Sequence, residues 1–104
     1  MNILFICNQN KNRSKTAEVL FSDMYSTKSA GLYNSKPVNA KQLEWADTII
    51  VMEDEQRSEL AKRFPKQYMQ KRILLLDIPD IYSYNNPQLV QLLREKMEIT
   101  ATIA

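Results

Sequence analysis

Apolar runs alternate with segments of helical periodicity along the chain. Three of the runs are predicted to be strands, and the first is apolar on both faces, as a central strand of a parallel sheet should be. They are Asn2–Ile6, Thr48–Met52 and Arg72–Leu76. Strands that alternate with helices indicate an α/β fold with a parallel sheet and right-handed crossovers between the strands.

The segments between these runs are predicted to be helices. After Arg13, apolar residues fall at positions i, i+3, i+4 and i+7, which is one face of a helix that extends to about Tyr25. Residues that cap or stop helices mark three more: Asn39 begins a short helix to Ala46, Asp54 caps a helix that runs through Phe64 and stops at Pro65, and Asn86-Pro87 opens the last helix. Residues Ile99–Ala104 are expected to form a loose tail.

Length and composition narrow the class of protein. The 104 residues fit a single domain, 1–104. A formal net charge of +2 is too small to favour nucleic acid or an anionic membrane as the main partner. No run reaches the roughly 20 apolar residues of a membrane-spanning helix. A single cysteine excludes an internal disulfide and suits a reducing compartment, so a cytoplasmic location is expected.

The residues after the first strand have the composition of an anion site. The stretch Cys7-Asn8-Gln9-Asn10-Lys11-Asn12-Arg13-Ser14 lies between a buried strand and the start of a helix. Backbone N–H groups and the positive end of the helix dipole point into such a corner. Arg13 adds a two-pronged phosphate clamp, and Cys7 adds a nucleophile that the same field favours as a thiolate. A lone cysteine after a buried strand is more often a small core hydrophobe, but the arginine six positions later favours the functional interpretation.

A loop that wraps around a phosphate usually needs residues with positive φ. This loop contains no glycine, but asparagine recurs at positions 8, 10 and 12. Asparagine is the next most tolerant residue type after glycine. The composition of the loop is therefore compatible with a phosphate cradle.

These residue types predict a phosphate monoester hydrolase. The Cys7 thiolate would attack phosphorus and form a phosphocysteine, while Arg13 and the loop amides hold the equatorial oxygens. Ser14 could donate a hydrogen bond to the sulfur. No metal or other cofactor is required, and because the chain has no histidine, a carboxylate must protonate the leaving group.

The same stretch resembles the phosphate loop of the low-molecular-weight protein tyrosine phosphatases. Further segments that resemble the family are Ala17-Glu18 in its first helix, Ser29-Ala30-Gly31 at the end of its second strand, and Pro79-Asp80-Ile81-Tyr82 in its late aspartate-proline-tyrosine segment. The resemblance implies a three-layer sandwich whose four-stranded parallel sheet has the order 2-1-3-4, with a second strand at Ser26–Ala30. It also implies protein-tyrosine-phosphatase activity. Substrate contacts would then come from the loop residues Asn8, Gln9, Asn10, Lys11, Asn12 and Ser14.

Two carboxylates compete for the role of general acid, Asp77 and Asp80. Alignment on the family's late segment favours Asp80, whereas Asp77 suits a turn after a strand. Tyr82 would wall the pocket and stack on an aromatic leaving group. The chain departs from the family pattern at Gln9 and Asn12, where glycine and a second cysteine are common, and at Ile81, which replaces a proline.

Other classes of protein fit parts of this pattern. A phosphorylated protein, a small phosphate ester and a phosphorylated end of a nucleic acid are all open as substrates. A non-catalytic phosphate or phosphoprotein sensor could keep the loop with the acid misplaced. A phosphocysteine carrier of the sugar-transport kind needs a long-lived phosphoenzyme, whereas Arg13 and a nearby acid favour turnover. An arsenate reductase would need further cysteines, which the chain lacks.

Overall fold

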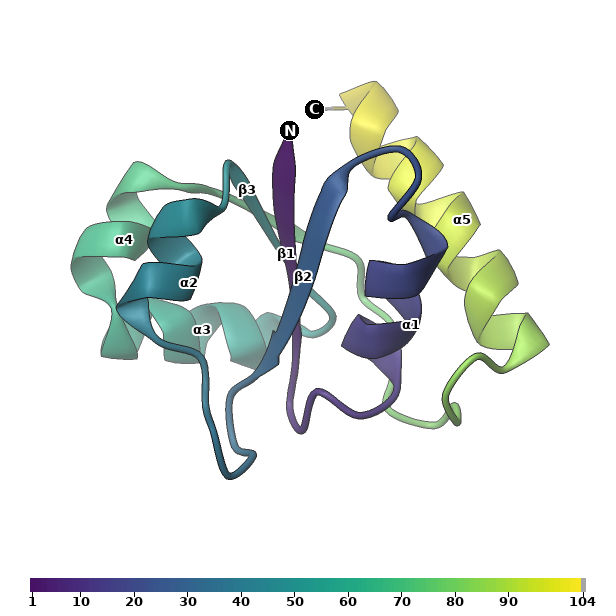
Figure 1. Ribbon diagram of the computed structural model, residues 1–104, viewed down its shortest axis with the longest axis horizontal. Coiled ribbons are helices and arrows are strands. Elements are labelled where there is room, and N and C mark those ends of the chain that lie inside the picture. Colours follow the sequence, from purple (N-terminus) through teal and green to yellow (C-terminus); the bar gives the residue numbers. More distant parts are fainter. Residues whose placement is uncertain (104) are drawn as a thin grey trace.

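The computed structural model describes residues 1–103, with side chains as far as Thr100. In chain order, its elements are β1 (Asn2–Cys7), α1 (Arg13–Leu20), β2 (Ser26–Gly31), α2 (Ala40–Trp45), β3 (Thr48–Val51), α3 (Asp54–Arg63), α4 (Pro65–Gln70), β4 (Arg72–Leu75) and α5 (Pro87–Ile103). The four strands form one parallel sheet in the order β2-β1-β3-β4 (Figure 1). The predicted α/β class and strand order are confirmed.

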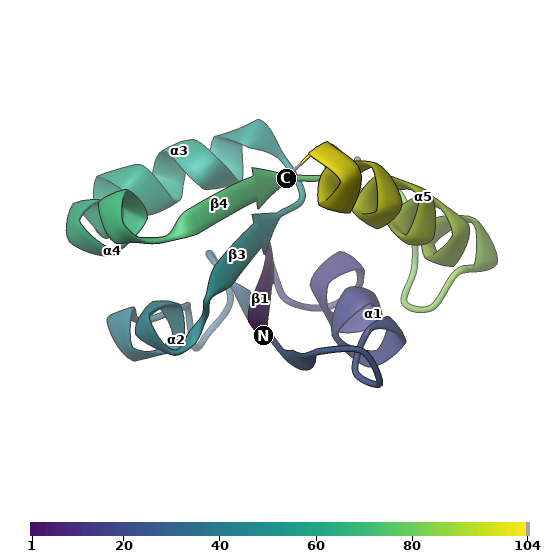
Figure 2. The same ribbon diagram turned by 90° about the horizontal axis from the view of Figure 1, so that it is seen from above.

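Helices cover both faces of the sheet, so the fold has three layers (Figure 2). Successive side chains of a strand point to opposite faces, and β1 follows this rule. Its residues Ile3, Phe5 and Cys7 share one apolar cluster with residues of α1 and α5. Leu4 and Ile6 belong to a second cluster with residues of α2 and α3. A strand buried on both faces explains why the first run is apolar throughout.

Helix α1 ends at Leu20 instead of continuing to about Tyr25. Of the residues predicted to form its apolar face, Phe21 is 5% exposed and stacks on Phe5, as expected. Met24 is 66% exposed and does not belong to the core. The chain has to turn here, because Ser26 already starts β2 and donates its N–H to the carbonyl of Met1.

The predicted boundaries of the third helix also differ from the structure. The cap of α3 is Glu53, and Asp54 is the first helical residue. Pro65 stops α3 as predicted but also begins α4, because a proline in a first turn lacks only an N–H that has no helical partner.

The predicted tail from Ile99 is wrong as far as Ile103, because α5 continues to that residue; Ala104 lies outside the described residues. The β-branched residues near this end have low helix propensity, which is a weak predictor. The apolar seam of Leu89, Leu93 and Met97 at i, i+4 and i+8 packs α5 on the core. Within residues 1–103, no helix combines the length and apolar character needed to cross a bilayer.

Because all strands run in the same direction, their carboxyl ends lie together at one edge of the sheet, the lower edge in Figure 1. Residues 8–12 after β1 and residues 76–86 after β4 form loops at this edge. Ligands of open parallel sheets bind at such an edge. The loop that the sequence singles out therefore lies where the fold favours a site.

Candidate active site

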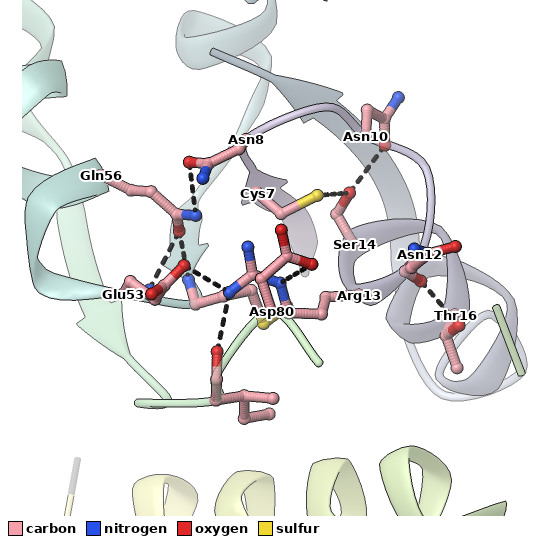
Figure 3. A network of polar contacts seen from close by, with 12 residues as sticks. Cys7, Asn8, Asn10, Asn12, Arg13, Ser14, Thr16, Glu53, Gln56 and Asp80 are labelled. Carbon is pink, nitrogen blue, oxygen red and sulfur yellow. Dashed lines mark hydrogen bonds and ion pairs between the residues drawn. The ribbon is translucent and has the colours of Figure 1, made fainter. Parts of the chain in front are cut away.

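Residues that follow three of the strands meet at the carboxyl edge (Figure 3). The loop of residues 8–12 follows β1, Glu53 follows β3, and Ile78 and Asp80 follow β4. The side chain of Arg13, from the first turn of α1, extends among them and is 1% exposed. A buried guanidinium is costly unless it is paired and hydrogen-bonded. Its partners therefore define the site.

Cys7 is the last residue of β1, and its sulfur faces the first turn of α1. Cys7 is 3% exposed, and its Sγ lies 2.9 Å from Oγ of Ser14. The Ser14 hydroxyl also donates to Oδ1 of Asn10 at 2.7 Å. A hydroxyl has one proton, so Ser14 can donate to Asn10 beside a neutral thiol and turn to the sulfur when the sulfur is an anion. This is the contact that the prediction for Ser14 requires.

The asparagines of the loop have three different roles. Asn10 has φ of 52°, a left-handed conformation that asparagine tolerates. Asn8 accepts a hydrogen bond from Nε2 of Gln56 at 3.1 Å. Asn12 is the cap residue of α1, and its carbonyl accepts from the hydroxyl of Thr16 at 2.7 Å. The expectation that asparagine replaces glycine at positive φ is therefore confirmed at position 10, whereas Asn8 and Asn12 have negative φ.

The guanidinium of Arg13 is hydrogen-bonded at Nη1, whereas its other edge has an ion pair with Asp80 but no hydrogen bond. Nη1 donates to Oε1 of Glu53 at 2.6 Å and to the carbonyl of Ile78 at 2.7 Å. Nε is buried without a hydrogen-bond partner, and its nearest carboxylate oxygen, Oδ1 of Asp80, lies 3.6 Å away. Nη2 makes no hydrogen bond with any residue that the structure describes. The Nε–Nη2 edge can therefore donate two parallel hydrogen bonds to one oxyanion.

The sequence interpretation missed two residues of this site, Glu53 and Gln56. Gln56 is 1% exposed, and its Oε1 accepts from the backbone N–H groups of Met52 and Glu53 at 2.8 and 3.0 Å. Its Nε2 donates to Asn8, as described above. Polar residues directly after a buried strand were a usable signal, because carboxyl ends of parallel strands meet at one edge.

The other predicted site residues are dispersed around this centre. Gln9 and Lys11 are exposed. Tyr82 is half-buried and packs on the apolar cluster that contains Cys7, so its role as a stacking wall stays a prediction. Of the two candidate acids, Asp80 lies beside Arg13, whereas Asp77 is exposed and has φ of 60°. Among the side chains that the structure describes, no group of three or more metal-ligating residues occurs.

Comparison with known proteins identifies similar structures but no similar sequence. No protein-family model and no curated protein matches the chain. The low-molecular-weight protein tyrosine phosphatase from T. tengcongensis has a TM-score of 0.77 at 18% identity, with 99% of this chain and 97% of that chain covered. The tyrosine phosphatase Wzb from Escherichia coli K30, in complex with phosphate, has a TM-score of 0.77 at 19% identity, with 97% of this chain and 96% of that chain covered. The YwlE arginine phosphatase from Geobacillus stearothermophilus has a TM-score of 0.71 at 18% identity, with 97% of this chain and 94% of that chain covered.

Identities below one fifth establish the fold alone. The chain thus has the α/β fold of the low-molecular-weight protein tyrosine phosphatases, as the resemblance of its loop implies. The proteins that share this fold here are phosphatases of two kinds, for tyrosine and for arginine.

Proposed function

We propose that this chain is a metal-independent phosphate monoester hydrolase, similar to the protein tyrosine phosphatases, that works through a phosphocysteine at Cys7. The observation that carries the proposal is that the buried Nε of Arg13 makes no hydrogen bond. A buried Nε without a partner costs free energy unless a ligand satisfies it, and a tetrahedral oxyanion fits a bidentate guanidinium edge. The phosphatases that share the fold support the same reaction class.

In the first step, the Cys7 thiolate attacks phosphorus in line with the ester oxygen. The S–P bond forms as the P–O ester bond breaks, and a protonated carboxylic acid gives its proton to the leaving oxygen. Arg13 and the loop amides hold the equatorial oxygens and offset the charge of the transition state. The residues predicted to line this cradle are Asn8, Gln9, Asn10, Lys11, Asn12 and Ser14.

In the second step, water attacks phosphorus and gives a proton to the same carboxylate. The S–P bond breaks, and inorganic phosphate and the thiolate are released. The Ser14 hydroxyl, 2.9 Å from the sulfur, stabilises the departing anion by donating to it. Each step balances without a redox partner, and no cofactor takes part.

We assign the acid to Asp80. Its carboxylate forms an ion pair with Nε of Arg13 at 3.6 Å, and the side chain is 53% exposed, so it has room to move to the leaving group when a phosphate takes its place. Tyr82, two residues on, would stack on an aromatic leaving group. The substrate on this proposal is a phosphorylated protein or a small phosphate ester in the cytoplasm.

The test is hydrolysis of p-nitrophenyl phosphate with a chelator present. We expect turnover by the wild type, none by Cys7→Ser, and a fall of about 10²-fold or more in kcat for Asp80→Asn. Asp77→Asn is the matched control, because it removes a carboxylate three residues away that has no recorded contact with Arg13. Parallel assays with phosphotyrosyl and phosphoarginyl peptides would separate the two substrate classes of the similar structures.

Three results would contradict parts of this proposal. Tight phosphate binding without turnover would indicate a sensor. A phosphocysteine that persists until an acceptor arrives would indicate a carrier. A larger loss in Asp77→Asn than in Asp80→Asn would mean that the acid is wrongly assigned.

A further inference from the structure

Glu53 has the geometry of a residue that acts through Arg13. Its Oε1 accepts from Nη1 at 2.6 Å, and the guanidinium that it holds is 1% exposed, while Glu53 itself is 31% exposed. The carbonyl of Ile78 accepts a second hydrogen bond from the same nitrogen at 2.7 Å. Two acceptors on Nη1 fix the plane of the guanidinium, and a fixed plane determines where the Nε–Nη2 edge points.

The backbone of Glu53 is itself held in place. Its N–H donates to Oε1 of Gln56 at 3.0 Å, and that oxygen also accepts a hydrogen bond from the N–H of Met52 at 2.8 Å. The amide nitrogen of Gln56 reaches Asn8 at the start of the phosphate loop. The turn from β3 into α3 therefore contacts both ends of the loop, Asn8 through Gln56 and Arg13 through Glu53 (Figure 3).

A carboxylate at this place has two opposing effects on an anion bound at Arg13. Its negative charge weakens the attraction of the site for phosphate. Its hydrogen bond removes rotational freedom from a guanidinium that would otherwise have to be ordered when substrate binds. The two effects can be separated, because glutamine keeps the reach and the acceptor without the charge, whereas aspartate keeps the charge but is one methylene shorter.

We infer that Glu53 is the positioning residue of the site: through its hydrogen bond to Nη1, it orients Arg13 so that Nε and Nη2 face the oxyanion. The inference rests on the proposed phosphatase function for its kinetic test, but not for its binding test. It concerns orientation and not charge, so it predicts that Glu53→Asp, which keeps the charge, binds an oxyanion more weakly than the wild type, whereas a purely electrostatic role would leave the affinity of that variant unchanged.

The experiment compares Glu53→Gln and Glu53→Asp with the wild type. Tungstate, an oxyanion that resembles phosphate, is titrated by calorimetry, and kcat/KM is measured with p-nitrophenyl phosphate. Asp54→Asn is the matched control, because Asp54 is the neighbouring carboxylate in the same turn and pairs with Arg57. Thermal unfolding of every variant monitors the fold.

We expect Glu53→Gln to bind tungstate at least as tightly as the wild type and to keep kcat/KM within about threefold. Glu53→Asp should bind tungstate about tenfold more weakly and lose about 10- to 100-fold in kcat/KM. Asp54→Asn should match the wild type in both measurements. A structural role alone would make both losses follow the melting temperature.

The inference is overturned if Glu53→Asp binds tungstate as tightly as the wild type, or if Glu53→Gln binds it as weakly as Glu53→Asp. If the wild type turns over no phosphate ester, the proposed function fails, yet the tungstate affinity of Glu53→Asp relative to the wild type still decides whether Glu53 orients Arg13.

Discussion

Gly31 is the only glycine in the chain, and a single methyl group there should distort the phosphate loop. It lies opposite Cys7 in the pairing of β1 with β2. A Cβ at position 31 would lie 2.8 Å from Oδ1 of Asn34, 2.9 Å from its Cγ and 3.0 Å from the backbone nitrogen of Asn10. The side chain of Asn34 can move away. The backbone at Asn10 cannot move alone, because its own side chain is bonded to Ser14 beneath the site.

The contact with Asn10 has to open by a few tenths of an ångström to reach an ordinary distance. Overpacking of this kind costs about 1–3 kcal/mol. For a domain of this size, each 1 kcal/mol corresponds to a shift of about 4–8 °C in melting temperature. A misplacement of 1 Å can cost about 10²-fold in rate, so the smaller displacement here should cost about tenfold in kcat/KM.

The assay is thermal unfolding by circular dichroism together with hydrolysis of p-nitrophenyl phosphate. The double variant Gly31→Ala, Asn34→Ala is the informative control, since it removes the two contacts with Asn34 and keeps the contact with the loop. It should recover part of the stability and little of the activity. A Gly31→Ala protein with unchanged melting temperature and activity would refute the close approach, and full recovery of activity in the double variant would refute the role of Asn10.

Three further substitutions test the loop and its support. Ser14→Ala removes the hydroxyl 2.9 Å from Sγ and should lower kcat about tenfold with little change in KM, by steady-state kinetics; an equal rise in KM would contradict this. Asn10→Ala places alanine at φ of 52° and removes the acceptor for Ser14, so urea denaturation should reveal a loss of about 1–2 kcal/mol; an unchanged midpoint would contradict the left-handed conformation. Thr16→Val removes a hydroxyl that donates to the carbonyl of Asn12 at 2.7 Å and accepts from the N–H of Asn85 at 2.9 Å. Urea denaturation should show a loss of about 1–3 kcal/mol in the free energy of unfolding, and a loss near zero would contradict both hydrogen bonds.

The parts of the fold that the sequence predicted are those with strong local signals. The runs at β1 and β3 are apolar because these strands are buried on both faces. The run at β4 is apolar from Ile73 to Leu75, although this edge strand is exposed at Arg72 and half-buried at the other three residues. The strand at β2 has a weaker signal, since its first four residues are exposed or half-buried, and it was predicted only through the resemblance of its end to a family. Strand order likewise depends on which strands pair, and no local pattern carries that information.

The candidate residues that the sequence identified by their spacing lie in one segment, whereas Glu53 and Gln56 come from another segment and were missed. Cys7, Asn10, Arg13 and Ser14 are close in sequence, so their spacing between a strand and a helix was informative. Glu53 lies 40 residues from Arg13, and the bond between them forms only when the sheet brings the ends of β1 and β3 together. A carboxylate that precedes the first turn of a helix is also common for capping reasons alone, so its residue type did not mark Glu53.

The most direct test of the central claim is a crystal structure of the wild-type protein with tungstate. We predict one anion bound in the loop of residues 8–12, with Nε and Nη2 of Arg13 each donating to one of its oxygens and Sγ of Cys7 beneath its central atom. Nη1 should stay on Glu53 and the carbonyl of Ile78. An anion bound elsewhere, with Asp80 still the neighbour of Nε and the loop empty, would contradict the account.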